Sequence, residues 1–437
     1  SKTPIPAKLA TAWKNKIGGK LSALTVANGN IYVASVDRYE IHAIDEISGK
    51  TSWTFSAGGR IDSPPTIHDG TVYFGSADGW AYALRQTDGA LAWRFRGGPN
   101  DRRIVVRERL ESVWPVHGNI LVHEGSVVVA AGRSSYLDGG IHLFRLDPET
   151  SKTISATTIF SPDAKGKQPL NGGRDVRGVL NDVLLADGSD VYMRQCKLDF
   201  EKGSDAGEGI HLFTPLGFLD DTWWHRAYWV FNNEFKSHWS GWWRVGNEVP
   251  SGRILSYDEE FIFGFGRSAY NGGNTGQWRG GEKYQLFAVN RKQPTNASQP
   301  NQPAQDRREK KPTKKKGKRP KAPTKRKAPN LWETEVPLLA TSLATSKDAI
   351  YLAGPPNMFR AKGESGETAL QLTDTKAALA AWEGKRGGIL YGASTKDGKE
   401  TLRIDLPAPT VFDGMAAANK SLYLALKNGE VVCIKGN

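Results

Sequence analysis

Cysteine and methionine are scarce in this sequence, and long apolar runs are missing altogether. The 437 residues include three methionines and two cysteines, Cys196 and Cys433. Two cysteines cannot build a disulfide framework, and they lack the Cys-x-x-Cys spacing of common metal sites, so we interpret both as buried free thiols. No run of about eighteen apolar residues occurs, so no membrane span is predicted.

Short catalytic motifs are also missing. The sequence contains no Cys-x-x-Cys-His for haem attachment, no serine nucleophile elbow, no phosphate loop and no His-Glu-x-x-His. These absences remove the most direct signals of the corresponding enzyme classes. A carboxylate pair for glycoside cleavage could be drawn from Asp182, Asp220 or Asp221, but most proteins of this size offer such a pair.

The positive charge is confined to one segment. Between Asp306 and Lys327 there are thirteen basic and two acidic residues, so +11 of the net charge of +13 lies there and the rest of the chain carries +2. Because Lys, Pro and polar residues cannot form a core, we predict a disordered low-complexity loop over residues 296–330. It is either a solvated loop or a tether with weak affinity for polyanions, and it lacks the aromatic residues needed for base stacking.

Two stretches forty residues apart share one pattern. They read "AIDEISGKTSW" from Ala43 to Trp53 and "ALRQTDGALAW" from Ala83 to Trp93. Around each, short alternating runs are separated by Asn-Gly, Asp-Gly or Ser-Gly turns, which is the signal of antiparallel strands. A period near forty residues with four strands per repeat is typical of β-propellers, so we predict an all-β fold.

The tryptophan in each repeat has a mechanical explanation. A four-stranded blade cannot bury both of its faces alone, so blades stack around an axis. We expect Trp53 and Trp93, in the outermost strands, to bridge to a neighbouring blade. The glycine four residues before each tryptophan supplies the positive φ that a tight turn requires.

The pattern Ala-x-Asp-x-x-(Thr/Ser)-Gly-x-x-x-Trp resembles the tryptophan-docking repeat of the PQQ-like (quinoprotein-type) β-propeller superfamily. Residues 43–53 match it fully, residues 83–93 depart at Arg85, and "RLDPETSKTIS" (Arg145 to Ser155) keeps the turn but loses Gly and Trp. The resemblance is strong over residues 20–95 and weaker to about 160. Because the superfamily covers quinoprotein dehydrogenases and many non-enzymatic relatives, it implies the fold more firmly than the function.

The strand rhythm continues to the end of the chain. It indicates one propeller domain over residues 1–437 with about seven four-stranded blades, or eight if an insertion hides one. The last run, Val411 to Gly436, offers only three strands, and Leu9 to Ile17 reads as the missing outer strand, with Trp13 in the docking position. We therefore predict that this N-terminal strand completes the last blade and closes the ring. A short helix is expected in "TDTKAALAAWEGK", residues 373–385.

A tryptophan-rich insertion over residues 218–247 interrupts the repeat. Indoles beside charged groups suit sugar rings, because the aromatic face covers C–H patches while polar groups hold hydroxyls. The alternative is that these indoles only pack between blades. The binding candidates from this segment are Trp223, Trp224, His225, Arg226, Trp242 and Trp243.

A second set of candidates lies near the starts or ends of strands expected to face the axis. Such polar groups either line a watery channel and bind a ligand, or pair with each other and with the backbone to close the pore. This set comprises Trp114, His117, Asn181, Asp182, Arg194, Arg253, Arg267 and Asp413.

Cofactor expectations follow from the resemblance. Quinoprotein enzymes use a vicinal cysteine pair against the quinone and a calcium ion held by acidic and amide side chains. Here Cys196 and Cys433 lie far apart, and matching calcium ligands cannot be placed, so we predict no PQQ, no calcium and no other metal.

The sequence therefore predicts a non-catalytic binding or scaffold propeller, periplasmic or otherwise extracytoplasmic as its superfamily relatives usually are. We expect it to be part of a larger chain or assembly, with a protein partner or neighbouring domain and with carbohydrate as a further ligand. The alternatives are a carbohydrate-active hydrolase or lyase that uses the channel mouth and the tryptophan-rich loop, and a divergent PQQ-dependent oxidoreductase.

Overall fold

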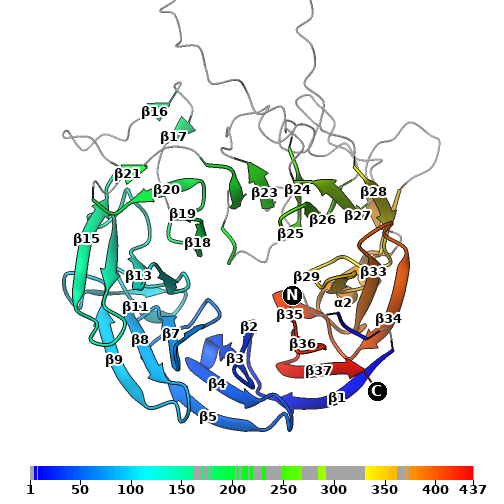
Figure 1. Cartoon of the computed structure of the whole chain (residues 1–437), viewed down its shortest axis with the longest axis horizontal. Helices are drawn as coiled ribbons and strands as arrows, with labels where there is room; N and C mark the ends of the chain where they lie inside the picture. Colours follow the sequence, from blue (N-terminus) through cyan, green and yellow to red (C-terminus); the bar gives the residue numbers. More distant parts are fainter. Residues whose placement is uncertain are drawn as a thin grey trace, which may run out of the picture.

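The strands form eight main sheets arranged in a ring around a central axis (Figure 1). All pairings within these sheets are antiparallel, and the first strand of a typical blade lies nearest the axis. The computed structural model describes residues 4–6, 8–161, 170–171, 175–176, 180–201, 204–205, 209–214, 217–219, 229–232, 249–267, 284–291, 330–361, 370–372 and 374–436.

Blades 1 to 4 follow the chain. Blade 1 consists of β2 (Leu21–Ala27), β3 (Asn30–Ser35), β4 (Glu40–Asp45) and β5 (Thr51–Ser56), with the short 3-10 helix η1 (Val36–Arg38) between β3 and β4. Blade 2 consists of β6 (Thr66–His68), β7 (Thr71–Gly75), β8 (Trp80–Arg85) and β9 (Leu91–Arg96). Blade 3 consists of β12 (Leu121–His123), β13 (Ser126–Ala131), β14 (Ile141–Leu146) and β15 (Thr153–Ile159). Blade 4 consists of β18 (Leu184–Asp187), β19 (Asp190–Met193), β20 (Cys196–Asp199) and β21 (Ser204–Asp205).

Blade 5 differs from the others because it has three strands in the described part of the chain: β22 (His211–Phe213), β23 (Trp229–Asn232) and β24 (Ser251–Gly252). Blade 6 consists of β25 (Ile254–Tyr257), β26 (Phe261–Arg267), β27 (Tyr284–Asn290) and β28 (Trp332–Glu335). Blade 7 consists of β29 (Ser342–Thr345), β30 (Ala349–Gly354), β33 (Gly388–Ser394) and β34 (Glu400–Leu406). Blade 8 consists of β35 (Thr410–Ala418), β36 (Ser421–Leu426), β37 (Glu430–Gly436) and β1 (Leu9–Lys16).

Smaller elements decorate the ring. Three two-stranded hairpins join β10 (Arg103–Val106) to β11 (Arg109–Ser112), β16 (Leu170–Asn171) to β17 (Asp175–Val176), and β31 (Phe359–Ala361) to β32 (Leu370–Leu372). The helix α2 (Thr375–Trp382) lies where a short helix was predicted. Asp374 caps it, because its carboxylate accepts a hydrogen bond from the Ala377 N–H.

The ring closes as the sequence predicts. β1 pairs with β37 from Leu9↔Gly436 to Lys16↔Glu430, and Trp13 lies opposite Cys433. The Glu46 carboxylate of blade 1 accepts hydrogen bonds from Tyr423 of blade 8 at 2.6 Å and from Asn419 at 2.8 Å. The junction between the last blade and the first is therefore held by a strand pairing and by side chains.

Outer-strand tryptophans bind the next blade along the ring, which confirms the mechanical role predicted for them. In each case the indole N–H donates to a main-chain carbonyl in the turn between the third and fourth strands of the neighbour. The four bonds run from Trp13 to Glu46 (3.0 Å), from Trp53 to Gln86 (2.9 Å), from Trp93 to Pro148 (2.8 Å) and from Trp332 to Thr395 (2.9 Å).

A glycine lies under most of these indoles. Gly89 has φ +72°, and a Cβ atom there would lie 2.6 Å from Trp53. Gly49 lies in the same way beneath Trp13, and Gly398 beneath Trp332. The glycine therefore permits both the left-handed turn and the close approach of the indole. In the decayed third repeat Ser151 occupies this left-handed position with φ +56°, and Trp93 still docks there.

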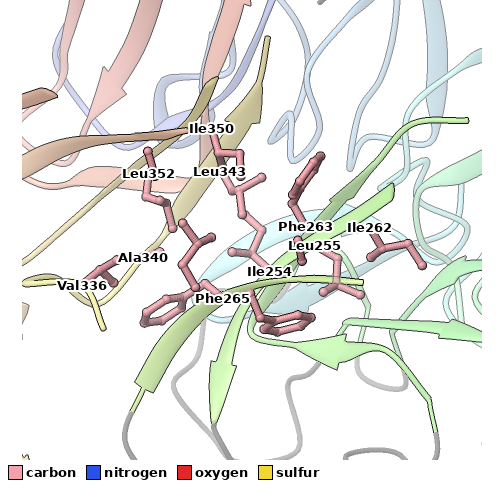
Figure 2. Close-up of a cluster of buried hydrophobic side chains, with 14 of the residues drawn as sticks. Ile254, Leu255, Ile262, Phe263, Phe265, Val336, Ala340, Leu343, Ile350 and Leu352 are labelled. Carbon is pink, nitrogen blue, oxygen red and sulfur yellow. The ribbon is translucent and has the colours of Figure 1, made fainter. Parts of the chain in front are cut away.

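Apolar side chains fill the spaces between blades. Figure 2 shows part of one such core, to which Ile254 and Phe265 of blade 6 and Leu343 and Leu352 of blade 7 contribute. Each buried Phe, Leu or Ile contributes about 1.5–3 kcal/mol relative to an exposed one. These inter-blade layers hold the axial segments in fixed positions.

The blade count is eight, the higher of the two predicted values. The additional blade arises where β22 pairs with β23, which lies inside the tryptophan-rich segment. That segment therefore contributes a strand as well as an insertion. The predicted loop over residues 296–330 lies outside the described residues, apart from Asn330.

Both cysteines are free thiols. Cys433 is buried as predicted, whereas Cys196, which was also predicted to be buried, is only partly buried. They lie in blades 8 and 4, so no vicinal pair exists.

Candidate functional site

Polar side chains gather at the end of the ring where the innermost strands begin, which we call the axial mouth. The starts of the inner strands pair with the ends of the second strands, as in Leu21↔Ser35, Ile254↔Phe265 and Ser342↔Ala353. The segments that lead into these strands therefore reach the axis from several blades at the same end of the molecule.

His117 and Asp62 form a pair at this mouth. The segment before blade 3 places His117 with its Nδ1 2.6 Å from Asp62 Oδ2, and Arg60 Nε lies 2.7 Å from the other carboxylate oxygen. Burial alone would raise the pKa of Asp62, but the hydrogen bond from His117 and the charge of Arg60 outweigh it and hold that pKa below its usual value. The pair orients the imidazole, whose other nitrogen has no hydrogen-bond partner among the described residues.

Arg60 extends this pair into a longer network. Its guanidinium also lies 3.4 Å from the buried Glu111, and Arg133 donates to the other oxygen of Glu111 at 2.7 Å. Glu111 belongs to β11, so the network fixes the β10–β11 hairpin to the mouth. Two cations around one buried carboxylate compensate its desolvation.

Asn181 and Asp182, in the segment that leads into blade 4, connect this segment to neighbouring parts of the ring. The Asn181 amide donates to the main-chain carbonyls of Pro115, Ala130 and Gly132 at 2.9–3.1 Å, which joins the lead-in segment of blade 4 to blade 3. Asp182 accepts the Phe218 N–H at 3.0 Å and lies 3.8 Å from Arg194. Burial raises the pKa of Asp182 to about 6, although Arg194 and the amide donors lower it.

An aromatic contact crosses the axis at the mouth end of the ring. Trp229 of blade 5 meets Phe412 of blade 8 edge-on, with ring centroids 5.9 Å apart, and Phe218 packs on the other side of Trp229 at 4.8 Å. The guanidinium of Arg253, which is buried, lies 4.9 Å from the Phe412 ring. This contact fixes Arg253 beside the axis by a cation–π interaction.

Asp413 follows Phe412 at an irregular point in β35. The pairing of β35 with β36 shifts between Thr410 and Met415, and Asp413 has φ +56°. Its N–H donates to Thr341 of blade 7 at 2.8 Å. Burial raises the pKa of its carboxyl to about 7, although part of the side chain remains accessible to solvent. A left-handed aspartate deep at the axis is a site of local strain.

The remaining candidates are spread more widely. Trp114 is buried and donates from Nε1 to Asp138 at 2.9 Å, with Arg102 over its ring. Arg267 ends β26 opposite Tyr284. The candidates of the tryptophan-rich segment lie outside the described residues: Trp223, Trp224, His225, Arg226, Trp242 and Trp243.

The structure thus brings His117 close to Asp62, and Asp182 close to Arg194, and it places Arg253 against Phe412, the residue before Asp413. Sequence reasoning missed Arg60, Asp62 and Arg133. The available signal was a charged residue just before or after a predicted axial strand, as in "GGRIDSPP". The binding roles of the sequence-predicted candidates remain predictions.

A cleft of about 490 Å³ lies beside blade 5. Ile210, Phe231, Glu259 and Arg291 line it, and the Arg291 guanidinium lies 5.4 Å from the Phe231 ring. Arg291 also donates to the Asp258 carbonyl at 2.9 Å. The lining of the cleft therefore combines two apolar side chains with one acidic and one basic side chain.

The described residues do not fit a calcium ion with a quinone. Calcium requires several carboxylate or carbonyl oxygens directed at one point. Asp62 and Glu111 are paired with cations, and Asp182 accepts main-chain amides. Within the described ranges no three His, Cys, Asp or Glu side chains are grouped to hold a metal.

The ring of stacked four-stranded sheets, joined by docked tryptophans, has the fold and the repeat of the PQQ-like β-propeller superfamily. A family model described as "Outer membrane protein assembly factor BamB" matches residues 7–195, which is less than half of the chain.

Curated relatives carry the same description. Outer membrane protein assembly factor BamB of Moranella endobia is 30% identical over 80 residues, which is 18% of this chain and 20% of that protein. The protein of that name from Burkholderia pseudomallei is 26% identical over 166 residues, which is 38% of this chain and 39% of that protein. The matches thus span about a fifth and about two-fifths of these relatives.

A solved structure shows the same fold over nearly the whole chain. The quinohemoprotein alcohol dehydrogenase ADHIIG from Pseudomonas putida HK5 superimposes with a TM-score of 0.54 at 10% identity, covering 98% of this chain and 76% of that one. At this identity the likeness shows the fold alone. None of the helices in the described ranges is long and apolar enough to cross a membrane.

Proposed function

We propose that this chain is a non-catalytic scaffold propeller that works outside the cytoplasm and contributes a protein-binding surface to an assembly at the outer membrane. The observation that carries the proposal is the match of residues 7–195 to the outer membrane assembly factor family. Three of the four tryptophan docking bonds, those of Trp13, Trp53 and Trp93, start within this matched range.

The electrostatics of the mouth support a scaffold. Most charged groups there satisfy one another: Arg60 with Asp62, Arg133 with Glu111, and Arg194 with Asp182. Paired groups of this kind fix the inner strands and leave few charges to drive a reaction. We infer no cofactor for this function.

Fractionation and native complex analysis test the proposal. The protein should be found outside the cytoplasm, and it should co-migrate on native gels with proteins that assemble outer membrane β-barrels. Deleting its gene should lower the amount of those β-barrels. A cytoplasmic location, or unchanged β-barrel levels together with no co-migration, would refute the proposal.

A second candidate function is ligand binding at the mouth, and the His117–Asp62 pair favours it. An imidazole held at Nδ1 by a carboxylate presents a defined second nitrogen to hydroxyl-bearing ligands such as carbohydrates. Glycan binding that is lost in His117→Ala but retained in Asn119→Ala would support it. If no glycan in a broad panel shifts the melting temperature of the native protein, this candidate fails.

A further inference from the structure

Exposed apolar side chains concentrate on one sector of the mouth face. Twelve large apolar side chains are exposed in the described part of the chain, and six of them lie at the mouth end of blade 3 or in the hairpin before it; Ile154, at the other end of the outer strand β15, is not one of the six. Val105 is the most exposed of the six at 75%. The six are Ile104, Val105, Leu110, Leu137, Phe160 and Leu180.

Short-range contacts bring these six residues into one neighbourhood. Arg102, next to the hairpin, bonds to Asp138, the residue after Leu137. The residue after Phe160, Ser161, donates its N–H to the Ser135 carbonyl, and Leu180 forms a β-bridge with Ser134. We call this surface the blade 3 patch. Exposed apolar side chains gathered in one neighbourhood mark interaction sites.

The β10–β11 hairpin at the centre of the patch is held rigidly. Arg109 bonds to Asp37 of blade 1 at 2.6 Å, and Glu111 is held by Arg60 and Arg133. The turn is Arg107-Glu108, with φ of +48° and +65°, which is the two-residue hairpin geometry with both central residues left-handed. The hairpin is therefore a preorganised element that keeps apolar residues in solvent.

Among the described residues, the outer edge of β10 pairs with no other strand. The register pairs Val106 with Arg109 and Ile104 with Glu111. In a two-residue hairpin these are the hydrogen-bonded pairs, so the N–H and C=O groups of Arg103 and Val105 point away from β11. In the described part of the chain, no main-chain group of Arg103–Val106 bonds outside the hairpin. An open edge with apolar side chains is a template for another strand.

We propose that β10 receives an extended segment of a partner protein, which adds as a third strand to the hairpin and lays apolar side chains on the blade 3 patch. This inference rests on the proposed scaffold function and names its contact surface. Strand addition gives affinity through main-chain hydrogen bonds and specificity through the side-chain contacts on either side.

Charge selects the partner. Arg103 and Arg107 flank Val105 in the sequence. Arg103 forms an ion pair with Asp101 at 3.1 Å, whereas Arg107 has no ion-pair partner among the described residues. An antiparallel second copy centred on Val105 would place Arg103 opposite Arg107 twice, and like charges in that position are destabilising. The geometry therefore favours an acidic, apolar segment of a different protein.

The experiment uses a photo-crosslinking amino acid at Leu110, which is the cross-strand neighbour of Val105. The same amino acid at Ile154, an equally exposed residue of the outer strand β15, serves as the matched control. After irradiation in the producing cell, mass spectrometry identifies the adduct. We expect one defined protein at Leu110 and at least tenfold less of it at Ile154.

The variant Val105→Pro then tests strand addition. It removes the one outward N–H of Val105, which the hairpin does not use, so the fold should be retained. The adduct yield at Leu110 should fall at least tenfold, whereas Val105→Thr, which keeps the N–H, should lower it less than threefold. If Val105→Pro does not fold, Arg107→Glu replaces it and should lower the yield by at least fivefold.

The outcomes separate this inference from the proposed function. An adduct that persists in Val105→Pro and Arg107→Glu, or an adduct with a second copy of this chain, overturns strand addition by a partner. An adduct that depends on Val105 but contains no protein of outer membrane assembly supports the strand addition and overturns the proposed assembly role.

Discussion

Blades 1 and 2 differ from blade 5 in how they are held in the ring. In blades 1 and 2 an outer tryptophan docks on the turn of the next blade, so each junction repeats one local rule. Blade 5 has three described strands and is positioned by Trp229, which reaches Phe412 across the axis, and by Arg291 against Phe231. The junctions of blades 1 and 2 with their neighbours therefore use the same docking contact. The position of blade 5 depends more strongly on a single residue, Trp229.

The largest effect is expected from removing the contact across the axis. Trp229→Ala should lower the free energy of unfolding by about 3–5 kcal/mol, because it leaves a cavity between Phe218 and Phe412. Trp53→Ala should cost about 2 kcal/mol, since this indole is partly exposed before the change. Denaturant titration measures both. An equal or larger loss in Trp53→Ala would mean that blade 5 is no more dependent on one residue than blade 1.

The docking turn offers a matched pair of glycines. Gly89 and Gly70 both have φ +72°, but an added Cβ would lie 2.6 Å from Trp53 at Gly89 and would meet nothing within 4 Å at Gly70. Gly70→Ala should therefore cost about 1 kcal/mol from backbone strain alone. Gly89→Ala should cost about 2 kcal/mol more, because the indole must move. Equal costs in thermal or denaturant unfolding would show that the indole moves without penalty.

The axial carboxyl of Asp413 should make stability depend on pH. Burial raises its folded pKa to about 7, above its unfolded value, so the native state holds the proton over the range between the two values. Stability should therefore fall as pH rises from about 4 to 7 and then level off. Asp413→Asn should flatten this part of the profile and raise the melting temperature more at pH 8 than at pH 4. A parallel profile for the variant would contradict the assignment.

The smallest effect concerns the decayed repeat of blade 3. Ser151 occupies the left-handed position that Gly49 and Gly89 hold in the intact repeats. Ser151→Gly should therefore stabilise the protein by about 0.5–1 kcal/mol, because the strain at φ +56° is relieved. Denaturant titration of the variant and of the native chain measures this difference in stability. A loss of stability would mean that the serine side chain makes a compensating contact.

The parts of the fold that obey a local rule could be predicted from the sequence. The spacing of Gly49 and Trp53 predicts a turn and a docking residue, and the three strands after Val411 predict that β1 closes the ring. The eighth blade was harder to predict because β22 and β23 are separated by an insertion longer than either strand.

The candidate site was less accessible to sequence reasoning. The position of His117 before an axial strand indicates that it faces the mouth, but its partner Asp62 is 55 residues away and lies in another blade. Trp229 and Phe412 are farther apart still in the chain. Such pairs depend on how blades sit around the axis, and no periodicity in one strand encodes this.

The pairing of β1 with β37 also determines how the ring responds to force. Leu9 and Gly436 lie opposite each other at one end of that pairing. Because ladder hydrogen bonds run perpendicular to the strands, a pull that separates Leu9 from Gly436 loads these bonds one pair at a time. The ring should therefore open at this seam under a modest load, while the other blades remain folded.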